Sequence, residues 1–260
     1  MLYHHTRQHV IFADPKTAAF WYPNVQHGGP LAGLLVELVR EKMPAVGMQL
    51  ARLYMSLIRP VYAGELMWDM QLIKSGRNIQ QVKVVLSQNQ RLVLHGTLLF
   101  YKIKSGSPKG QLLQLPAWAE TKGYSPKWPE GQSVHFAKDV AKIRLIKGQM
   151  ISDHQEGAAW IDVGVHCLVD QIPISGDARV AIVADFSNAL SSVISVDEGR
   201  FINADLSVEF IRQSDQLDLM LWSKTYSEGF GSGVVDGQIY DQAGLVAFCR
   251  QTILLDHGET

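Results

Sequence analysis

The sequence predicts an α+β fold made of two copies of one unit, in which a helix precedes several antiparallel strands. An offset of 153 residues, the difference between Ile58 and Ile211, aligns the two halves of the chain without a gap. In each half a helical pattern precedes a series of stretches in which apolar and polar residues alternate. These observations indicate a duplicated domain, because solenoid repeats are much shorter.

The helix of the first half is expected at residues 29–43. Leu31, Leu34 and Leu38 recur there at helical spacing, and Pro30 suits the first helical position. The pattern then changes to an alternation that is typical of strands. We expect these strands near residues 53–58, 66–73, 79–86 and 91–101, with a hairpin turn at 88–91.

A segment rich in proline, glycine and serine, residues 102–132, separates the two halves. We therefore predict an N-terminal repeat at residues 1–101, a linker, and a C-terminal repeat at residues 133–260. The second repeat is expected to contain short strands, then a helix, then strands in the order of the first half. Their ranges are 134–146 and 158–169 for the short strands, 178–194 for the helix and 201–255 for the later strands.

Composition limits the classes of function. The 260 residues are 47% hydrophobic with a formal net charge of -1, so the sequence predicts an ordinary globular protein without a nucleic-acid partner. The longest apolar stretch, residues 31–39, contains Glu37 and is too short to span a membrane. Cys167 and Cys249 lie in strand-like sequence and are expected to be buried thiols. We expect no signal peptide and a cytoplasmic location.

Three positions distinguish the two copies. At each of them the second copy has a polar residue, whereas the first copy has a residue of a different chemical type. They are Asp205 opposite Arg52, Thr225 opposite Leu72, and Gln251 opposite Leu98. This asymmetry predicts that the chemistry resides in the C-terminal repeat.

A carboxylate, a hydroxyl and an amide suffice to activate a water molecule. A carboxylate accepts the proton of the water, while the other two side chains orient it. Residues 229–233 lack the spacing of a nucleophilic serine motif and lie in strand-like sequence. We therefore expect Asp205 to be the base and Thr225 and Gln251 to hold the water.

Each of these residues also has a structural interpretation. Asp205 stands at a strand entrance, where aspartate commonly bonds nearby backbone amides. Thr225 suits any strand. Gln251 falls on an apolar face, where an amide without a partner costs about 1 to 3 kcal/mol, so it requires a polar neighbour. Asp185, inside an apolar helix one turn before Asn188, is the main alternative base.

The turn before the first helix offers a second chemical feature. Gly28 and Gly29 precede Pro30, and the first amides of a helix are unpaired and partly positive. Such amides can stabilise an oxyanion, although glycines there also allow close packing of helix and sheet. His27 adjoins this turn, and a capping role is expected for it.

Four segments resemble the type II acyl-CoA thioesterase-like family, whose members have a double hotdog fold. They are residues 26–35, 56–60, 184–188 and 203–207. The resemblance implies two tandem hotdog repeats, each with a long central helix wrapped by an antiparallel sheet, joined as a pseudo-dimer. It also implies a catalytic Asp, Thr or Ser, and Gln, which fall on Asp205, Thr225 and Gln251, with Ser227 as an alternative hydroxyl.

The resemblance implies an enzyme of fatty acid metabolism that hydrolyses acyl-CoA or a related acyl thioester, without cofactor or metal and as a homo-oligomer of the pseudo-dimer. His4, His5 and His9 lack supporting ligands, so we expect no metal site there. Two other functions remain open. One is a non-catalytic acyl-thioester binding protein, and the other is an enoyl-thioester hydratase, which usually pairs an aspartate with a histidine. The sequence places no histidine near Asp185.

Overall fold

The architecture was analysed in a computed structural model of the 260-residue chain. It describes residues 1–20, 22, 24–43, 47–104, 110, 112–128, 134–195 and 197–256. The parts of the predicted linker at 105–109, 111 and 129–132 lie outside the described residues.

Strands dominate both repeats. In the first they are β1 (Tyr3–Arg7), β2 (Val10–Ala13), β3 (Met48–Leu57), β4 (Gly64–Ser75), β5 (Ile79–Gln88) and β6 (Arg91–Lys102). In the second they are β7 (Lys142–Lys147), β8 (Glu156–Asp162), β9 (Arg200–Asn203), β10 (Asp205–Phe210), β11 (Asp218–Ser227), β12 (Ser232–Asp241) and β13 (Gly244–Asp256). The bounds of β5 and β12 differ by 153 residues at both ends, as the offset predicts.

The helices are fewer and mostly short. They are α1 (Gly28–Lys42), α2 (Phe136–Asp139), α3 (Gly176–Ala184) and α4 (Ser187–Leu190), with 3-10 turns η1 (Pro15–Thr17) and η2 (Ala117–Glu120). Helix α1 begins one residue before the predicted range.

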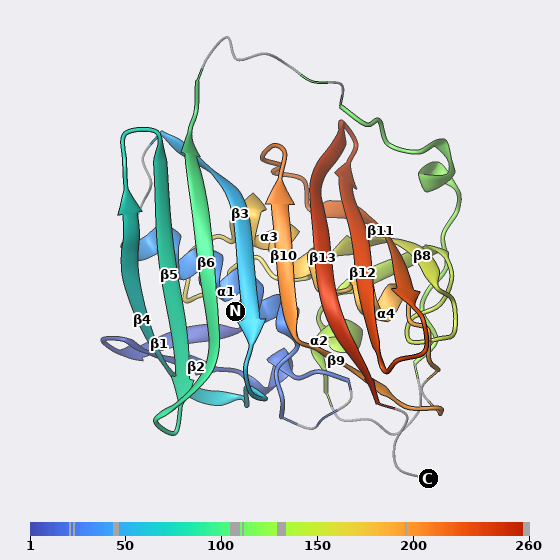
Figure 1. The fold of residues 1–260 in the computed structure, drawn as a ribbon, viewed down its shortest axis with the longest axis horizontal. Coiled ribbons are helices and arrows are strands. Elements are labelled where there is room, and N and C mark those ends of the chain that lie inside the picture. The colour runs from blue at the N-terminus through green and yellow to red at the C-terminus, as the bar shows by residue number, and fades with distance from the viewer. Residues whose placement is uncertain are drawn as a thin grey trace.

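The strands form one antiparallel sheet that runs through both repeats (Figure 1). Its order is β1-β2-β4-β5-β6-β3-β10-β13-β12-β11-β8-β7, with β9 paired to β13. The second half of this order mirrors the first, and the repeats join where β3 pairs with β10. The predicted architecture, two tandem units with central helices wrapped by antiparallel sheet, is therefore confirmed.

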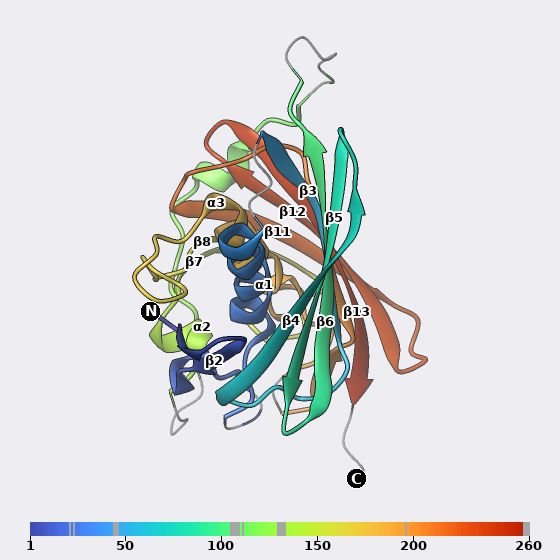
Figure 2. The same cartoon turned by 90° about the vertical axis from the view of Figure 1, so that its left-hand side faces the viewer.

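The helices lie inside the curve of the sheet. Figure 2 shows α1 and α3 between the central strands on one side and β2, β7 and β8 on the other. Close packing requires glycine: a Cβ on Gly33 of α1 would lie 2.8 Å from Cγ1 of Ile182 in α3. The two helices thus meet at the pseudo-twofold centre.

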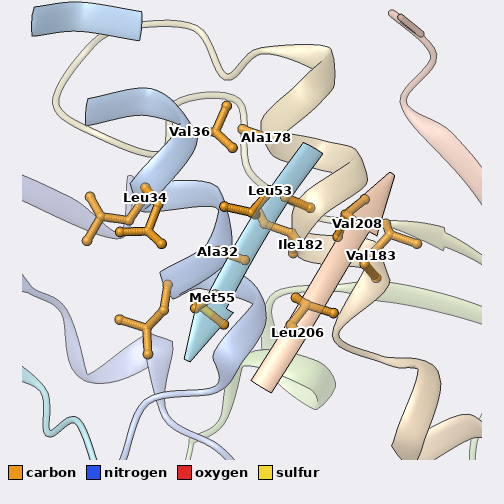
Figure 3. Close-up of a cluster of buried hydrophobic side chains, with 14 of the residues drawn as sticks. Ala32, Leu34, Val36, Leu53, Met55, Ala178, Ile182, Val183, Leu206 and Val208 are labelled. Carbon is orange, nitrogen blue, oxygen red and sulfur yellow. The ribbon is translucent and has the colours of Figure 1, made fainter. Parts of the chain in front are cut away.

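Apolar side chains fill the centre between the helices and the β3-β10 junction (Figure 3). Leu53 and Met55 of β3 and Leu206 and Val208 of β10 point toward the helices and are fully buried. Because successive side chains of a strand point to opposite faces, Arg52 of β3 faces away from this core. The two repeats share one hydrophobic core.

Two predicted elements differ from the structure. The predicted helix at 178–194 is divided into α3 and α4, because the chain tightens to i→i+3 bonds where Phe186 N–H donates to the carbonyl of Val183. The predicted strand at 134–146 begins instead with α2, whose first amides are capped by the His135 side chain, so only β7 remains as a strand.

The predicted linker covers the outer face of the second repeat. An outer cluster is buried there, formed by Ala119, Trp160, Met220, Tyr240 and Leu245 with Leu112 and Leu115 packed against it. Hydrogen bonds fix this segment to the sheet, and two of them lie at the outer cluster. Trp160 Nε1 donates to the carbonyl of Ala119 at 2.8 Å, and Leu245 N donates to the carbonyl of Leu113 at 2.8 Å.

Leu53→Ala tests the shared core. We expect it to lower the free energy of unfolding by about 2 to 5 kcal/mol, because it leaves a cavity at the junction of the repeats. Arg52→Ala, on the outward face of the same strand, is the matched control and should change stability by no more than about 0.5 kcal/mol. Equal effects in chemical denaturation would contradict the assignment of the core face.

Candidate active site

A cavity of about 450 Å³ lies at the N-terminus of α1, between the two repeats. The N-terminal repeat contributes His27, Gly28 and Leu31 to its lining. The C-terminal repeat contributes Asp185 and Asn203. The walls are mostly apolar, so the few polar groups define where chemistry can occur.

Asp185 is the central polar residue of this cavity. It ends α3 and is 3% exposed. Its Oδ1 atom accepts hydrogen bonds from Asn203 Nδ2 at 3.1 Å and Gln251 Nε2 at 3.0 Å. Its Oδ2 atom lies 2.8 Å from Nδ1 of His27. Both carboxylate oxygens are therefore held in place by neighbouring side chains.

The amide side chains around Asp185 form a closed network. Asn203 accepts a hydrogen bond from Nδ2 of Asn188, and the backbone N–H of Asn188 donates to Oε1 of Gln251 at 3.2 Å. Gln251 is fully buried. The polar partner that the sequence requires for Gln251 is thus Asp185 together with the start of α4.

Position 28 requires glycine because the carboxylate of Asp185 lies very close to its Cα atom. A Cβ built there would lie 2.6 Å from Oδ1 and 2.8 Å from Oδ2 of Asp185. The carboxylate therefore packs directly against the first turn of α1. The amides of this turn have no partner within the helix and carry partial positive charge.

His27 caps α1 and also contacts Asp185. Its Nδ1 atom lies 3.1 Å from the backbone N of Gly29 and 2.8 Å from Asp185 Oδ2. A neutral imidazole nitrogen either donates or accepts. The position of one proton therefore decides whether His27 caps the helix or donates to the carboxylate.

The structure does not bring the predicted trio together. Asp205 lies on the outward face of β10, and its carboxylate accepts from the backbone N–H of Thr252 at 2.8 Å and from the Thr252 hydroxyl at 3.3 Å. Asp205 therefore bonds a backbone amide, as its structural interpretation predicts, but this amide belongs to the neighbouring strand β13 and not to the adjacent turn. Strand alternation explains the separation, because the inward residues of β10 are Leu206 and Val208.

The predicted hydroxyl residues also lie away from Asp185. Thr225 faces inward but bonds the hydroxyl of Ser191 at 2.9 Å. It is two strands from Gln251 through Val235, roughly 10 Å by sheet spacing. Ser227, the alternative, donates to the carbonyl of Ser232 in the β11-β12 hairpin. Of the predicted trio, only Gln251 reaches the cavity network.

The pseudo-twofold counterpart of Asp185 is Glu37. Both carboxylates lie nine residues after the first residue of a helix, Gly28 of α1 or Gly176 of α3. Glu37 Oε1 accepts from the backbone N–H of Ser175 at 2.8 Å and from its hydroxyl at 2.6 Å. Each carboxylate thus contacts the residue that caps the helix of the other repeat.

The two sites differ in their supporting residues. At the strand offset of 153, Asn203 corresponds to Leu50 and Gln251 to Leu98, both buried and apolar. The sequence comparison identified Gln251 but missed Asn203 and favoured Asp205 over Asp185. Aligning the helices separately, at an offset of 148 from Gly28 to Gly176, would have paired Asp185 with Glu37.

Burial shifts the pKa of two groups near this site. It raises the pKa of the Cys249 thiol to about 12, so this cysteine is neutral and cannot act as a nucleophile. Burial also lowers the pKa of His135 from 6.5 to about 4, against the opposing charge of Asp139. His135 is therefore uncharged at neutral pH.

Within the part of the chain that the structure describes, no group of histidine, cysteine and carboxylate side chains is arranged to hold a metal ion. Among the same residues, no helix is both long and apolar enough to cross a membrane.

Comparison with known families identifies the family of this chain. Residues 17–101 match the acyl-CoA thioesterase N-terminal domain, and residues 115–255 match the acyl-CoA thioesterase C-terminal domain. The chain belongs to the acyl-CoA thioesterase family. It is a thioester hydrolase, as the resemblance in the sequence predicts.

Solved structures confirm the double hotdog fold of this family member. A candidate thioesterase of Novosphingobium aromaticivorans aligns over 98% of both chains with a TM-score of 0.78 and 18% identity. The acyl-CoA thioesterase II of Mycobacterium marinum covers 99% of this chain and 96% of its own, with a TM-score of 0.69 and 15% identity. A hot dog protein of unknown function from Alicyclobacillus acidocaldarius covers 98% and 96%, with a TM-score of 0.74 and 13% identity. The comparison with curated proteins gives no match.

The lowered pKa of His135 predicts a pH dependence of stability. Between pH 6.5 and about 4 the unfolded chain binds a proton at this residue that the folded protein does not. The contribution of neutral His135 is therefore complete above pH 6.5 and declines as the pH falls through this window. His135→Asn keeps a side chain that can cap α2 but removes the titration. Denaturant unfolding at several pH values should show a shallower loss of stability in the variant, and parallel profiles would contradict the prediction.

Proposed function

We propose that this family member hydrolyses acyl-CoA thioesters by direct attack of water, with Asp185 as the general base in place of Asp205. The observation that supports it is the Asp185 carboxylate, fixed by Asn203 and Gln251 in an apolar cavity and placed against the first turn of α1. Neither a serine nor a cysteine nucleophile is needed.

The chemistry follows from these contacts. Asp185 accepts a proton from a water molecule as its oxygen attacks the thioester carbonyl carbon. Collapse of the tetrahedral intermediate breaks the carbon-sulfur bond, and the leaving thiolate takes the proton back from Asp185. Asn203 and Gln251 keep the carboxylate oriented throughout, so they are positioning residues.

The first turn of α1 is suited to stabilise the oxyanion. The N–H of Gly28 opens the helix, and the absence of a side chain lets the Asp185 carboxylate pack against this turn, so a thioester carbonyl bound at the turn would lie beside the base. An aligned helix start adds partial positive charge where negative charge develops. Base and oxyanion donor thus come from different repeats.

Two arginines at the rim favour coenzyme A as the thiol. Arg59 lines the cavity and is exposed. The guanidinium of Arg200 lies 5.1 Å from the ring centre of Tyr22, another lining residue. Arginine at such positions can bind the phosphates of the coenzyme.

Asp185→Asn tests the assignment of the base. We expect thiol release from acyl-CoA to fall by about 10² to 10⁴, because the amide cannot accept the proton of the water. Asp205→Asn is the matched control and should keep activity within about threefold of wild type, since its carboxylate bonds Thr252 on the outer face. Circular dichroism and thermal unfolding establish that both variants fold. Full activity in Asp185→Asn would overturn Asp185 as the base, and loss in Asp205→Asn alone would restore Asp205 to that role.

One contact favours a second candidate function, hydration of an enoyl thioester. The argument against it in the sequence was that no histidine lies near Asp185. The fold overturns that argument, since His27 of the other repeat lies 2.8 Å from the carboxylate. A histidine and an aspartate from two repeats could hydrate a double bond, one deprotonating the water that attacks the β-carbon and the other protonating the α-carbon.

Enoyl-CoA as substrate separates the two functions. If water attacks the carbonyl, thiol is released and the double bond remains; if His27 and Asp185 hydrate the substrate, the ultraviolet absorbance of the enoyl group is lost without thiol release. We expect the first result. His27→Gln should lower thiol release by about tenfold or less, as suits a residue that positions Asp185. Rapid loss of enoyl absorbance without thiol release, abolished in His27→Gln, would favour the hydratase.

A further inference from the structure

The predicted linker reaches the active-site cavity. Trp128, near the end of the described part of this segment, lines the 450 Å³ cavity that contains Asp185. It also lines a second cavity of about 410 Å³. Phe20, Met150 and Ile151 line both cavities as well. Trp128 therefore stands in the wall between two adjacent spaces.

The two cavities differ in chemistry. Trp128 and Ala137 contribute apolar wall to the cavity of Asp185. The second cavity is lined by Lys127, Gln149 and Asp197 in addition to the shared apolar residues. An acyl chain that extended into it would meet polar groups at its far end.

The protein fixes Trp128 in this position. Its ring lies 6.2 Å from that of Phe20 and meets the ring of His135 edge-on at 5.2 Å and 69°. Tyr124, four residues earlier, exchanges backbone hydrogen bonds of 2.9 and 2.8 Å with Leu145 of the edge strand β7. The segment before Trp128 is thus anchored to the sheet.

We propose that Trp128 closes the far end of the acyl cavity and limits the substrate to acyl chains of medium length. This inference rests on the proposed function, because it assigns the cavity beside Asp185 to the acyl group. Trp128 is a specificity-determining residue supplied by the segment between the repeats.

The volume of the cavity sets the limit. A dry cavity of about 150 Å³ binds benzene, so a bound non-hydrogen atom occupies about 25 Å³. At this density 450 Å³ accommodates about 18 non-hydrogen atoms. This corresponds to the thioester end of the coenzyme together with an acyl chain of roughly ten to twelve carbons.

Affinity for S-alkyl-CoA thioethers tests the limit without requiring hydrolysis. Isothermal titration calorimetry with chains from butyl to octadecyl should show affinity rising by up to about fourfold per methylene, until the chain fills the cavity. In wild type we expect the affinity to stop rising near ten to twelve carbons, because a chain of about this length fills the cavity. In Trp128→Ala it should continue to longer chains, giving at least about tenfold higher affinity for the hexadecyl ligand than wild type.

Trp118→Ala is the matched control, because Trp118 belongs to the same segment, is 40% exposed and lines neither cavity. It should reproduce the wild-type profile. Trp128→Leu provides a second, more conservative opening of the wall, in case the alanine variant does not fold. Ala137→Leu, which narrows the cavity, should move the limit to shorter chains.

Hydrolysis of acyl-CoA of the same lengths separates this inference from the proposed function. Unchanged chain-length profiles for binding in both Trp128 variants would overturn the role of Trp128, even if wild type releases thiol. Failure of wild type to release thiol from any acyl-CoA, with a binding profile that shifts as expected, would overturn the proposed hydrolysis and leave the role of Trp128 supported. If wild type binds no alkyl-CoA, the role of Trp128 is overturned, whether or not wild type releases thiol.

Discussion

The arrangement of the site depends on one buried carboxylate at the junction of the two repeats. Asp185 is 3% exposed, and a carboxylate at such a depth is costly unless hydrogen bonds satisfy its oxygens. Its partners come from three separate places in the chain, namely His27 before α1, Asn203 of β9 and Gln251 of β13. Folding of both repeats is therefore required before this residue is stabilised. The same contacts aim it into the cavity.

Duplication explains why the site lies between repeats. The pseudo-twofold axis places the end of each helix opposite the beginning of the other, so Asp185 meets His27 and Glu37 meets Ser175. Only the first of these pairs is supported by amide side chains, because Leu50 and Leu98 replace them around the second. We infer that a symmetric scaffold kept one working site and made the other structural. The difference lies in the supporting residues more than in the carboxylates themselves.

The segment between the repeats has two structural roles that its composition does not indicate. Leu112, Leu115 and Ala119 cover the outer face of the second repeat, while Trp128 reaches the inner cavity. A thioesterase needs both a positioned base and a slot of defined depth. In the function that we propose, the repeats provide the base, and the connection between them contributes Trp128 to the slot.

The sequence by itself determined the duplication, the order of the strands and the requirement that Gln251 has a buried polar partner. These follow from periodicity and from the cost of burying an amide, which are local properties. It could not decide between Asp185 and Asp205, because both are carboxylates near apolar sequence. The tertiary structure places the two residues in different surroundings: β10 turns Asp205 outward to Thr252, whereas the tightened end of α3 turns Asp185 toward His27 and Gln251. Aligning the two halves at a single offset also failed to identify Asn203 and the pairing of Asp185 with Glu37. The reason for the missed pairing is that the strands of the two repeats align at one offset and the helices at another. Which side chains meet across a pseudo-twofold axis depends on how two distant segments pack, and no local pattern records that.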